Sequence, residues 1–306
     1  AGCASQSPVT LQTSPAPPDD GVEAISLLGK PLRRPALAPE VARQREAELA
    51  KARARWERNR NHPDDIIWFG RRTAYLGRYR EAIDIFTDGI RHHPHDARMY
   101  RHRGHRYITI RRLDDAIRDL ERAEELTRGK PDEIEPDGLP NARGVPTSSL
   151  QSNICYHLGL AWYLKGDFER ALPVYQRCAA LATNADRLVS NTHWLYMTLR
   201  RLGRPQEAER VLEPISSSLD VIENTAYHKL TLMYRGEIAP EELSKENPST
   251  VEGATILYGV GNWYLYNGEP EKAERFFRQI VEGGEWAAFG YIACEAEIAR
   301  STTLRE

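Results

Sequence analysis

The sequence predicts an all-α protein, a solenoid of repeated helix–turn–helix units with a capping helix at each end. Three observations lead to this prediction. Alternation of apolar and polar residues, which is typical of half-buried strands, is scarce. Apolar residues instead recur at helical spacing, and a pattern of small and aromatic residues returns with a period of 34. Segments with Gly or Pro separate the helical stretches, as expected where helices end.

The period is clearest in the first two copies. When the segment 66–94 is aligned with the one that follows it, Gly70 falls on Gly104 and Ala82 falls on Ala116, 34 positions apart in each case. Two antiparallel helices approach closely only where the residues between them are small. We therefore expect each glycine to pack against the alanine of the next helix, Gly104 against Ala116.

Further copies repeat the order of Gly, Gly, Ala and an aromatic residue. A clear copy spans 156–178, a looser one 194–212, and another clear one 257–277. Between the last two, the segment 227–243 is a degenerate copy in which Pro240 suits the start of a helix. The residues at the repeated positions are Gly159, Gly166, Ala171, Tyr175, Gly203, Ala208, Gly261, Gly268, Ala273 and Phe277.

This pattern resembles the tetratricopeptide repeat (TPR), a 34-residue helix–turn–helix unit with Gly and aromatic residues on its first helix and Ala on its second. The resemblance covers residues 63–282 and implies a right-handed superhelical solenoid of about five to six repeats. Two residues depart from the family pattern, Ile66 at a position that often holds Trp and Arg103 at a usually apolar one. Because a buried unpaired charge destabilises a fold, we expect Arg103 to pair with Asp84 or Asp88.

The segments outside the repeats suggest the division of the chain. Residues 1–39 are rich in Pro, Ser, Ala and Thr, so we expect a flexible tether. Residues 40–62 have a narrow apolar stripe and are expected to form an N-terminal capping helix. Residues 63–301 are the expected solenoid, with a second cap from residue 285 onward. A loop rich in Pro, Gly and Asp, residues 130–150, is inserted between its second and third repeats.

The bulk composition argues against several classes of protein. Charged residues make up 28% of the 306 residues but nearly cancel to a net charge of −2, whereas nucleic-acid-binding proteins are usually strongly basic. The mean hydropathy is −0.60, and no apolar run is long enough to span a membrane. Motifs of hydrolases, zinc proteases and phosphate-binding loops are missing. Neither enzymatic activity nor a cofactor is therefore predicted.

The sequence Ala1-Gly2-Cys3 resembles the end of a bacterial lipobox, in which the cysteine carries lipid. The resemblance implies a membrane anchor at Cys3 and a location on the periplasmic side of the bacterial cell envelope. A soluble cytoplasmic adaptor without lipid is the alternative.

Four cysteines are too few for a disulfide scaffold. Cys155 and Cys178 fall at facing positions of the third repeat. A disulfide between them would suit an oxidising compartment, but two small core residues are the interpretation that we favour from the sequence.

The stretch His92–His105 contains five histidines and three arginines. It suits a metal site, a phosphate-binding patch, or a polar turn followed by a helix that faces the groove. Asp96 is its one acidic residue, and the arginines share a helix that must also pack. The third interpretation is therefore favoured, and neither a metal nor a nucleic acid is predicted.

In the TPR family, the first helices of successive repeats line a concave groove that holds a peptide. Carried over to this sequence, the resemblance implies a groove rich in aromatic and basic residues, the types that dominate binding hot spots. The expected groove residues are Trp68, Arg71, Tyr75, Arg98, Arg101, His102, His105, Asn153, Tyr156, His157, Tyr163, His193, Trp194, Arg200, Tyr258, Asn262 and Tyr266.

Some TPR proteins hold the carboxylate of a peptide with basic and amide side chains on adjacent first helices. Similar residue types occur here, although lysine is absent, at Arg98, Arg101, His102, Asn153 and His157. We therefore expect a protein or peptide partner that presents a carboxylate, with a small ligand, an anion or a metal as the alternative. Binding should weaken as the pH rises through the range in which histidine loses its proton.

Overall fold

The computed structural model describes residues 21–303, so the expected lipid-attachment residue Cys3 lies outside the described residues. The described part is mostly helical, with fourteen helices and one two-stranded hairpin. The predicted fold of sequential helix pairs is confirmed, and the hairpin is an addition to it. Within residues 21–303, no helix is both long and apolar enough to cross a membrane.

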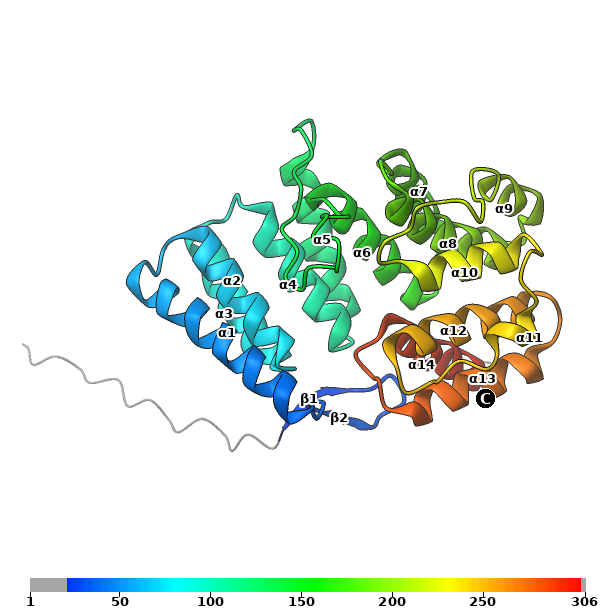
Figure 1. Cartoon of the computed structure of the whole chain (residues 1–306), viewed down its shortest axis with the longest axis horizontal. Coiled ribbons are helices and arrows are strands. Elements are labelled where there is room, and N and C mark those ends of the chain that lie inside the picture. Colours follow the sequence, from blue (N-terminus) through cyan, green and yellow to red (C-terminus); the bar gives the residue numbers. More distant parts are fainter. Residues whose placement is uncertain (1–20, 304–306) are drawn as a thin grey trace, which may run out of the picture.

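The helices follow one another around an arc, mostly as antiparallel pairs of chain neighbours (Figure 1). The first half of the described chain holds β1 (Val22–Ile25), β2 (Pro31–Arg33), α1 (Pro39–Arg58), α2 (Pro63–Tyr75), α3 (Tyr79–His92), α4 (Ala97–Thr109) and α5 (Leu113–Thr127). The second half holds α6 (Leu150–Lys165), α7 (Phe168–Ala180), α8 (Ala185–Arg201), α9 (Pro205–Val211), α10 (Thr225–Tyr234), α11 (Pro240–Leu243), α12 (Val251–Tyr266), α13 (Pro270–Gly283) and α14 (Phe289–Thr303). Residues 128–149, called the insertion below, lie between α5 and α6.

The glycines of the first helices face large side chains, not the alanines that the sequence suggested. A Cβ on Gly104 would lie 2.8 Å from Leu120 and 3.4 Å from the carbonyl oxygen of Ala116. A Cβ on Gly159 would lie 2.7 Å from the Tyr175 ring. The prediction for Gly104 therefore needs correction. The alanine lets the two helices approach, and the large residue one turn later fills the space over the glycine.

The turn inside a helix pair needs a backbone in the left-handed region. Gly77, Gly166 and Gly203 supply it with φ values of 75°, 80° and 69°, which glycine adopts without steric cost. In the second repeat, Arg111 holds the equivalent position with φ 67°, and among residues 21–303 no other residue except glycine has a positive φ. The contacts of its side chain explain why an arginine is kept in this conformation.

Arg111 links the second repeat to the last helix. Its Nε donates to Glu295 Oε2 at 2.9 Å, and its Nη2 donates to the carbonyl oxygen of Trp286 at 2.7 Å. The side chains of Arg111 and Glu295 are 3% and 0% exposed. The backbone N–H of Leu27 donates to the same Glu295 oxygen at 3.3 Å. One buried carboxylate therefore joins the hairpin, the second repeat and α14.

The hairpin corrects the prediction that all of residues 1–39 form a flexible tether. It lies between the N-terminal helices and the C-terminal ones (Figure 1). The indole Nε1 of Trp286 donates to the carbonyl oxygen of Arg33 at 2.8 Å, and the backbone N–H of Arg80 donates to Glu23 at 3.0 Å. The hairpin was not predicted because its strands are short and because the residues that hold it in place are distant in the sequence.

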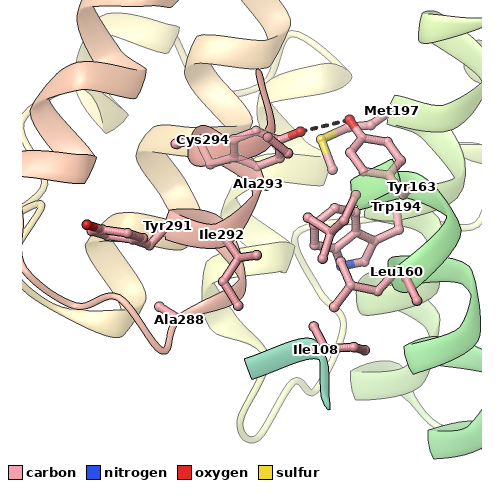
Figure 2. Packing of buried hydrophobic residues seen from close by; sticks show 14 of the residues in the cluster. Ile108, Leu160, Tyr163, Trp194, Met197, Ala288, Tyr291, Ile292, Ala293 and Cys294 are labelled. Carbon is pink, nitrogen blue, oxygen red and sulfur yellow. Dashed lines mark hydrogen bonds between the residues drawn. The ribbon is translucent and has the colours of Figure 1, made fainter. Parts of the chain in front are cut away.

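The last helix fills the inner side of the arc at its C-terminal end. Figure 2 shows Ile292 and Ala293 of α14 facing Leu160, Tyr163 and Trp194 of α6 and α8. All five side chains are buried. This part of the concave side is therefore hydrophobic core and not an open groove.

Arg103 is paired, but not with the expected acid. Its Nε and Nη2 donate to the two carboxylate oxygens of Asp119 at 2.7 Å each, and its Nη1 donates to Thr87 Oγ1 at 3.0 Å. The prediction of Asp84 or Asp88 was wrong because α5, the antiparallel partner of α4 in its own repeat, brings Asp119 to the guanidinium.

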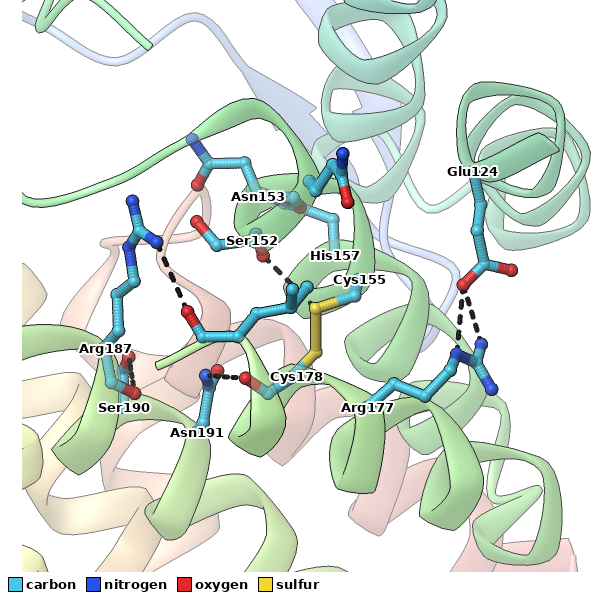
Figure 3. Close-up of a disulfide and its surroundings, with 12 residues drawn as sticks. Glu124, Ser152, Asn153, Cys155, His157, Arg177, Cys178, Arg187, Ser190 and Asn191 are labelled. Carbon is cyan, nitrogen blue, oxygen red and sulfur yellow. Dashed lines mark hydrogen bonds and ion pairs between the residues drawn. A yellow bond between two sulfur atoms is a disulfide. The ribbon is translucent and has the colours of Figure 1, made fainter. Parts of the chain in front are cut away.

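Cys155 and Cys178 form a disulfide that joins α6 to α7 (Figure 3). The sequence favoured two unbonded core residues, so this interpretation was wrong. Both cysteines are buried, and Asn191 donates to the carbonyl oxygen of Cys178 at 2.9 Å. Cys294 in α14 is a buried free thiol.

Candidate ligand-binding site on the concave face

The helix starts decide which side chains face inward. The Asp96 carboxylate accepts a hydrogen bond from the backbone N–H of Arg98 at 3.0 Å and begins α4. Ser149 and Ser152 form a capping box that begins α6. From these starts, residues spaced three and four apart share one face of each helix. On α4 and α6 these residues are Arg98, Arg101, His102, His105, Asn153, Tyr156 and His157.

Two cavities lie on this face, between the first helices and the insertion. The larger measures about 350 Å³ and the smaller about 210 Å³. The predicted groove residues in the larger cavity are Arg101, His105, Asn153, Tyr156 and His157. Those in the smaller cavity are Trp68, Arg71, Arg98 and His102. The structure thus brings together the predicted residues of α2, α4 and the first half of α6.

Arg71 lines the smaller cavity and Arg101 the larger one, and Arg106 lies beside them, with its guanidinium 2.6 Å from His105 Nδ1. These three arginines are called the arginine cluster below. Arg71 and Arg101 are 9% and 7% exposed, and Arg106 is half-buried. The Arg71 guanidinium lies 4.5 Å from the centre of the Trp68 ring, and its Nε donates to the Tyr75 hydroxyl at 3.4 Å. Burial and the charges of the other two arginines lower the pKa of Arg106 to about 10. Arg106 therefore remains cationic at neutral pH.

One carboxylate lies at pairing distance from this cluster. Glu135 of the insertion places its Oε2 3.0 Å from Arg101 Nε, although the N–H is not directed at that oxygen. Within residues 21–303, neither Arg71 nor Arg106 has a carboxylate within 4.0 Å. Asp64 and Glu133 also line the smaller cavity and Glu223 the larger one, but none of them is at pairing distance from Arg71 or Arg106. Because buried charges are stable only when paired, these two cations without an ion-pair partner indicate a site for an additional anion.

The histidines beside the cluster are neutral, which contradicts the expected role of charged imidazoles. Burial, followed by the charge of Arg101, lowers the pKa of His102 and of His157 well below the usual value. Burial and then Arg106 do the same to the pKa of His105. The prediction that binding weakens as these histidines lose their protons near neutral pH is therefore wrong. Arginines hold the positive charge of this site.

Two sequence profiles of the tetratricopeptide repeat family match the chain, at residues 69–133 and 154–188. The chain contains tetratricopeptide repeats. The matched ranges include the α4–α5 and α6–α7 pairs, whose first helices carry much of the concave site. A comparison with curated proteins gave no match.

Several solved structures are similar to this chain at low sequence identity. A TPR protein from Parabacteroides merdae is 12% identical, with a TM-score of 0.46, and the match covers 84% of this chain and 98% of that one. YrrB, described as a TPR protein with an unusual peptide-binding site, is 17% identical, with a TM-score of 0.42 and coverages of 77% and 91%. MamA is also 17% identical, with a TM-score of 0.41 and coverages of 73% and 92%.

Five residues that the TPR pattern placed in the groove lie in the core instead. Tyr163, His193, Trp194, Tyr258 and Asn262 are each at most 1% exposed. The Tyr258 hydroxyl and the Asn262 amide donate to the Tyr163 hydroxyl at 2.9 and 2.8 Å. The prediction was wrong for these five because α10 packs on His193 of α8, and because α12 and α14 pack against α6 and α8 and bury the other four.

Three predicted groove residues, Tyr75, Arg200 and Tyr266, are half-buried and line neither of the two cavities. The Arg200 guanidinium lies 4.4 Å from the centre of the Tyr266 ring and donates to Asn267 at 2.7 Å. Arg200 and Tyr266 therefore do not join the other TPR residues of the candidate site, whereas the Tyr75 hydroxyl lies beside it and accepts a hydrogen bond from Arg71.

Other residues of the site were missed from the sequence. Arg106 was not predicted. It directly follows His105, a predicted groove residue, and this adjacency was the one feature of the sequence that could have indicated its position. Phe289 of α14 lies with its ring centre 5.3 Å from that of His105 and 5.6 Å from that of His157. Nothing in the repeat pattern could place Phe289 there, because the contact depends on how α14 returns to the second and third TPR units. Glu135 was likewise missed, since loop composition does not predict a loop's path.

The histidine-rich stretch divides as the sequence suggested. His92 ends α3, and the next helix begins at Ala97, so His93 and His95 lie in the exposed turn between TPR units. Among residues 21–303, no three His, Cys, Asp or Glu side chains are placed to bind one metal ion.

Proposed function

We propose that this TPR protein is an interaction scaffold that binds an extended acidic segment of a protein partner on its concave face. The observation that carries the proposal is the arginine cluster, in which Arg101 alone lies at pairing distance from a carboxylate, that of Glu135, while Arg71 and Arg106 have none within 4.0 Å among the described residues. Arginine matches carboxylates in two-pronged geometry, and such charge-assisted hydrogen bonds strengthen where water is excluded.

The surroundings of the cluster suit a peptide backbone as well as a charge. Trp68 borders the smaller cavity, and Tyr156, Tyr227 and Phe289 border the larger one. Aromatic side chains of this kind supply much of the binding energy in protein interfaces. The amide of Asn153 lies in the same cavity and supplies hydrogen bonds that position a main chain.

A small anionic ligand is the second candidate function. The observation that favours it is the size of the larger cavity, about 350 Å³, which falls in the range of small-molecule sites. Such a ligand would be recovered by extraction of the purified native protein, whereas a protein partner would be recovered by crosslinking.

In-cell crosslinking of the native chain, followed by mass spectrometry, tests the peptide-binding proposal. Replacing Arg71 by methionine removes a cation that has no carboxylate partner, so the fold should tolerate the change while partner recovery falls at least about tenfold. Arg91→Met is the matched control, because this α3 side chain is 72% exposed and should leave recovery unchanged. Equal recovery by Arg71→Met and by the unaltered chain would contradict the proposal.

We further propose that lipid on Cys3 anchors the protein to the periplasmic side of the bacterial cell envelope. The Cys155–Cys178 disulfide supports an oxidising compartment, and the Ala1-Gly2-Cys3 sequence supports the lipid. Mass spectrometry of the native protein should find acyl chains on the peptide that contains Cys3. Recovery of that peptide with a free thiol, from a protein in the cytoplasmic fraction, would favour the soluble adaptor.

A further inference from the structure

The insertion crosses the concave face and is paired with its own return segment. The backbone N–H of Leu150 donates to the carbonyl oxygen of Glu133 at 2.8 Å, and that of Glu135 donates to Ser148 at 3.2 Å. The bridge between Ile134 and Ser149 belongs to the same pairing. The outgoing part of the insertion is therefore held in an extended course, as a bound peptide would be.

This outgoing part contacts α2 and α4 at the positions where a partner is expected. Residues 133–136 form one wall of the smaller cavity. Beyond them, Arg72 donates to the carbonyl oxygen of Gly138 at 2.9 Å. A Cβ on Gly138 would lie 1.7 Å from the Tyr75 hydroxyl, so the backbone reaches this helix only because residue 138 is glycine. Between these contacts, Glu135 reaches Arg101 with its carboxylate.

The insertion is held by polar contacts and contributes little to the core. Its apolar residues Ile134, Leu139 and Val145 are 70%, 58% and 45% exposed. At the tip of the insertion, Arg143 forms an ion pair with Asp220, and both side chains are exposed to solvent. Exposed ion pairs contribute little to stability. Such a segment can leave the concave face without opening the hydrophobic core.

We propose that residues 133–138 are an internal ligand of the arginine cluster, and that a partner binds by substituting its own acidic, extended segment for Glu135. The inference rests on the proposed function and deepens it. The partner segment would resemble the sequence that it displaces, an apolar residue, an acid and a proline in succession, as in Ile134-Glu135-Pro136. The proline favours an extended backbone at the acid before it.

The internal ligand also sets a threshold for binding. A tethered segment competes at a high effective concentration, commonly millimolar for a short flexible connection. The apparent affinity for a partner equals its affinity for the open site multiplied by the fraction of molecules in which the site is open. Weak acidic peptides are thereby excluded, and a partner with additional contacts along the face binds.

A labelled nonapeptide with the sequence of residues 130–138 tests this inference by fluorescence anisotropy on the full chain. Glu135→Gln removes the internal carboxylate, so this variant should bind the peptide at least about tenfold more tightly than the unaltered chain. A second variant, with residues 134–137 replaced by Gly-Ser-Gly-Ser, should show the same gain. A peptide carrying glutamine at the position of Glu135 should lose the affinity. Circular dichroism during thermal unfolding checks that both variants are folded.

Arg143→Ala is the matched control, because it loosens the exposed tip of the insertion and leaves Glu135 in place. It should bind the peptide as the unaltered chain does. Equal affinity of the unaltered chain and both Glu135 variants would overturn the inference, as would lack of binding to both variants. If neither Glu135 variant binds the peptide but partner recovery still depends on Arg71, the internal ligand is refuted and the proposed function stands. If the variants do not bind the peptide and partner recovery does not depend on Arg71, both proposals fail.

Discussion

Replacing Glu295 by glutamine should lower the free energy of unfolding by about 3–5 kcal/mol, since a buried ion pair that loses one member leaves an uncompensated charge. The remaining charge would be Arg111, whose guanidinium is enclosed by Trp286 and Tyr291, with its Cζ 5.4 and 5.9 Å from their ring centres. Glutamine keeps the size of the side chain, so the loss would come from charge. Urea denaturation of the two proteins measures the difference.

Two further variants separate this effect from general sensitivity to mutation. Glu207→Gln breaks the exposed pair with Arg204 and should leave the stability nearly unchanged. Adding Arg111→Gly to Glu295→Gln removes the orphaned cation and relieves the positive φ, so the double variant should be more stable than Glu295→Gln alone. A Glu295→Gln protein as stable as the unaltered chain would show that this pair does not hold the arc closed.

Acidification from pH 7 to pH 5.5 should lower the free energy of unfolding. Four histidines, His102, His105, His157 and His193, are kept neutral in the fold. Burial lowers the pKa of His193 to about 3, and the pKa values of the other three also lie well below the usual one. In the unfolded chain, histidine has a pKa of about 6.5.

The sign follows from the proton balance. Below pH 6.5 the unfolded chain takes up protons that the folded chain does not, so stability is full above this pH and falls as the pH decreases. For His193 this contribution is about 1 kcal/mol between pH 7 and pH 5.5. Carboxylates titrate mainly below this interval. Urea denaturation at both pH values is the measurement, and His193→Gln should make the loss smaller by about that amount. A stability that is the same at pH 7 and pH 5.5 would contradict the neutral state of these imidazoles.

The repeat period allowed the helix pairs and their inward faces to be predicted. Gly70 and Gly104, 34 positions apart, both lie where their helix meets the next one, against Phe86 and Leu120. The positions of Arg101 and His102 on the concave side were predicted from the resemblance to the TPR family. These predictions succeeded because helical spacing is a local property, and a TPR unit contacts mainly its neighbours.

The C-terminal half of the predicted groove failed for the opposite reason. Tyr163 and Tyr258 occupy first-helix positions, yet they hydrogen-bond to each other inside the core. The period of a repeat does not predict how strongly the arc of successive helix pairs is curved. Here the curvature is sufficient for α14 to return to α6, and contacts such as Arg111 with Glu295, 184 positions apart, close the arc. No local pattern encodes such a contact.

By itself, the sequence determined the helical repeats, the turn at His93–Asp96 and the concentration of arginine on one helix face, because these depend on residues within one or two repeats. The tertiary structure decided which of those faces remain accessible, and that the anion expected opposite Arg101 is the chain's own Glu135. The physical reason is that burial and charge pairing depend on the path of the insertion and the return of α14. These bring distant residues together and displace the water that would otherwise solvate the arginines.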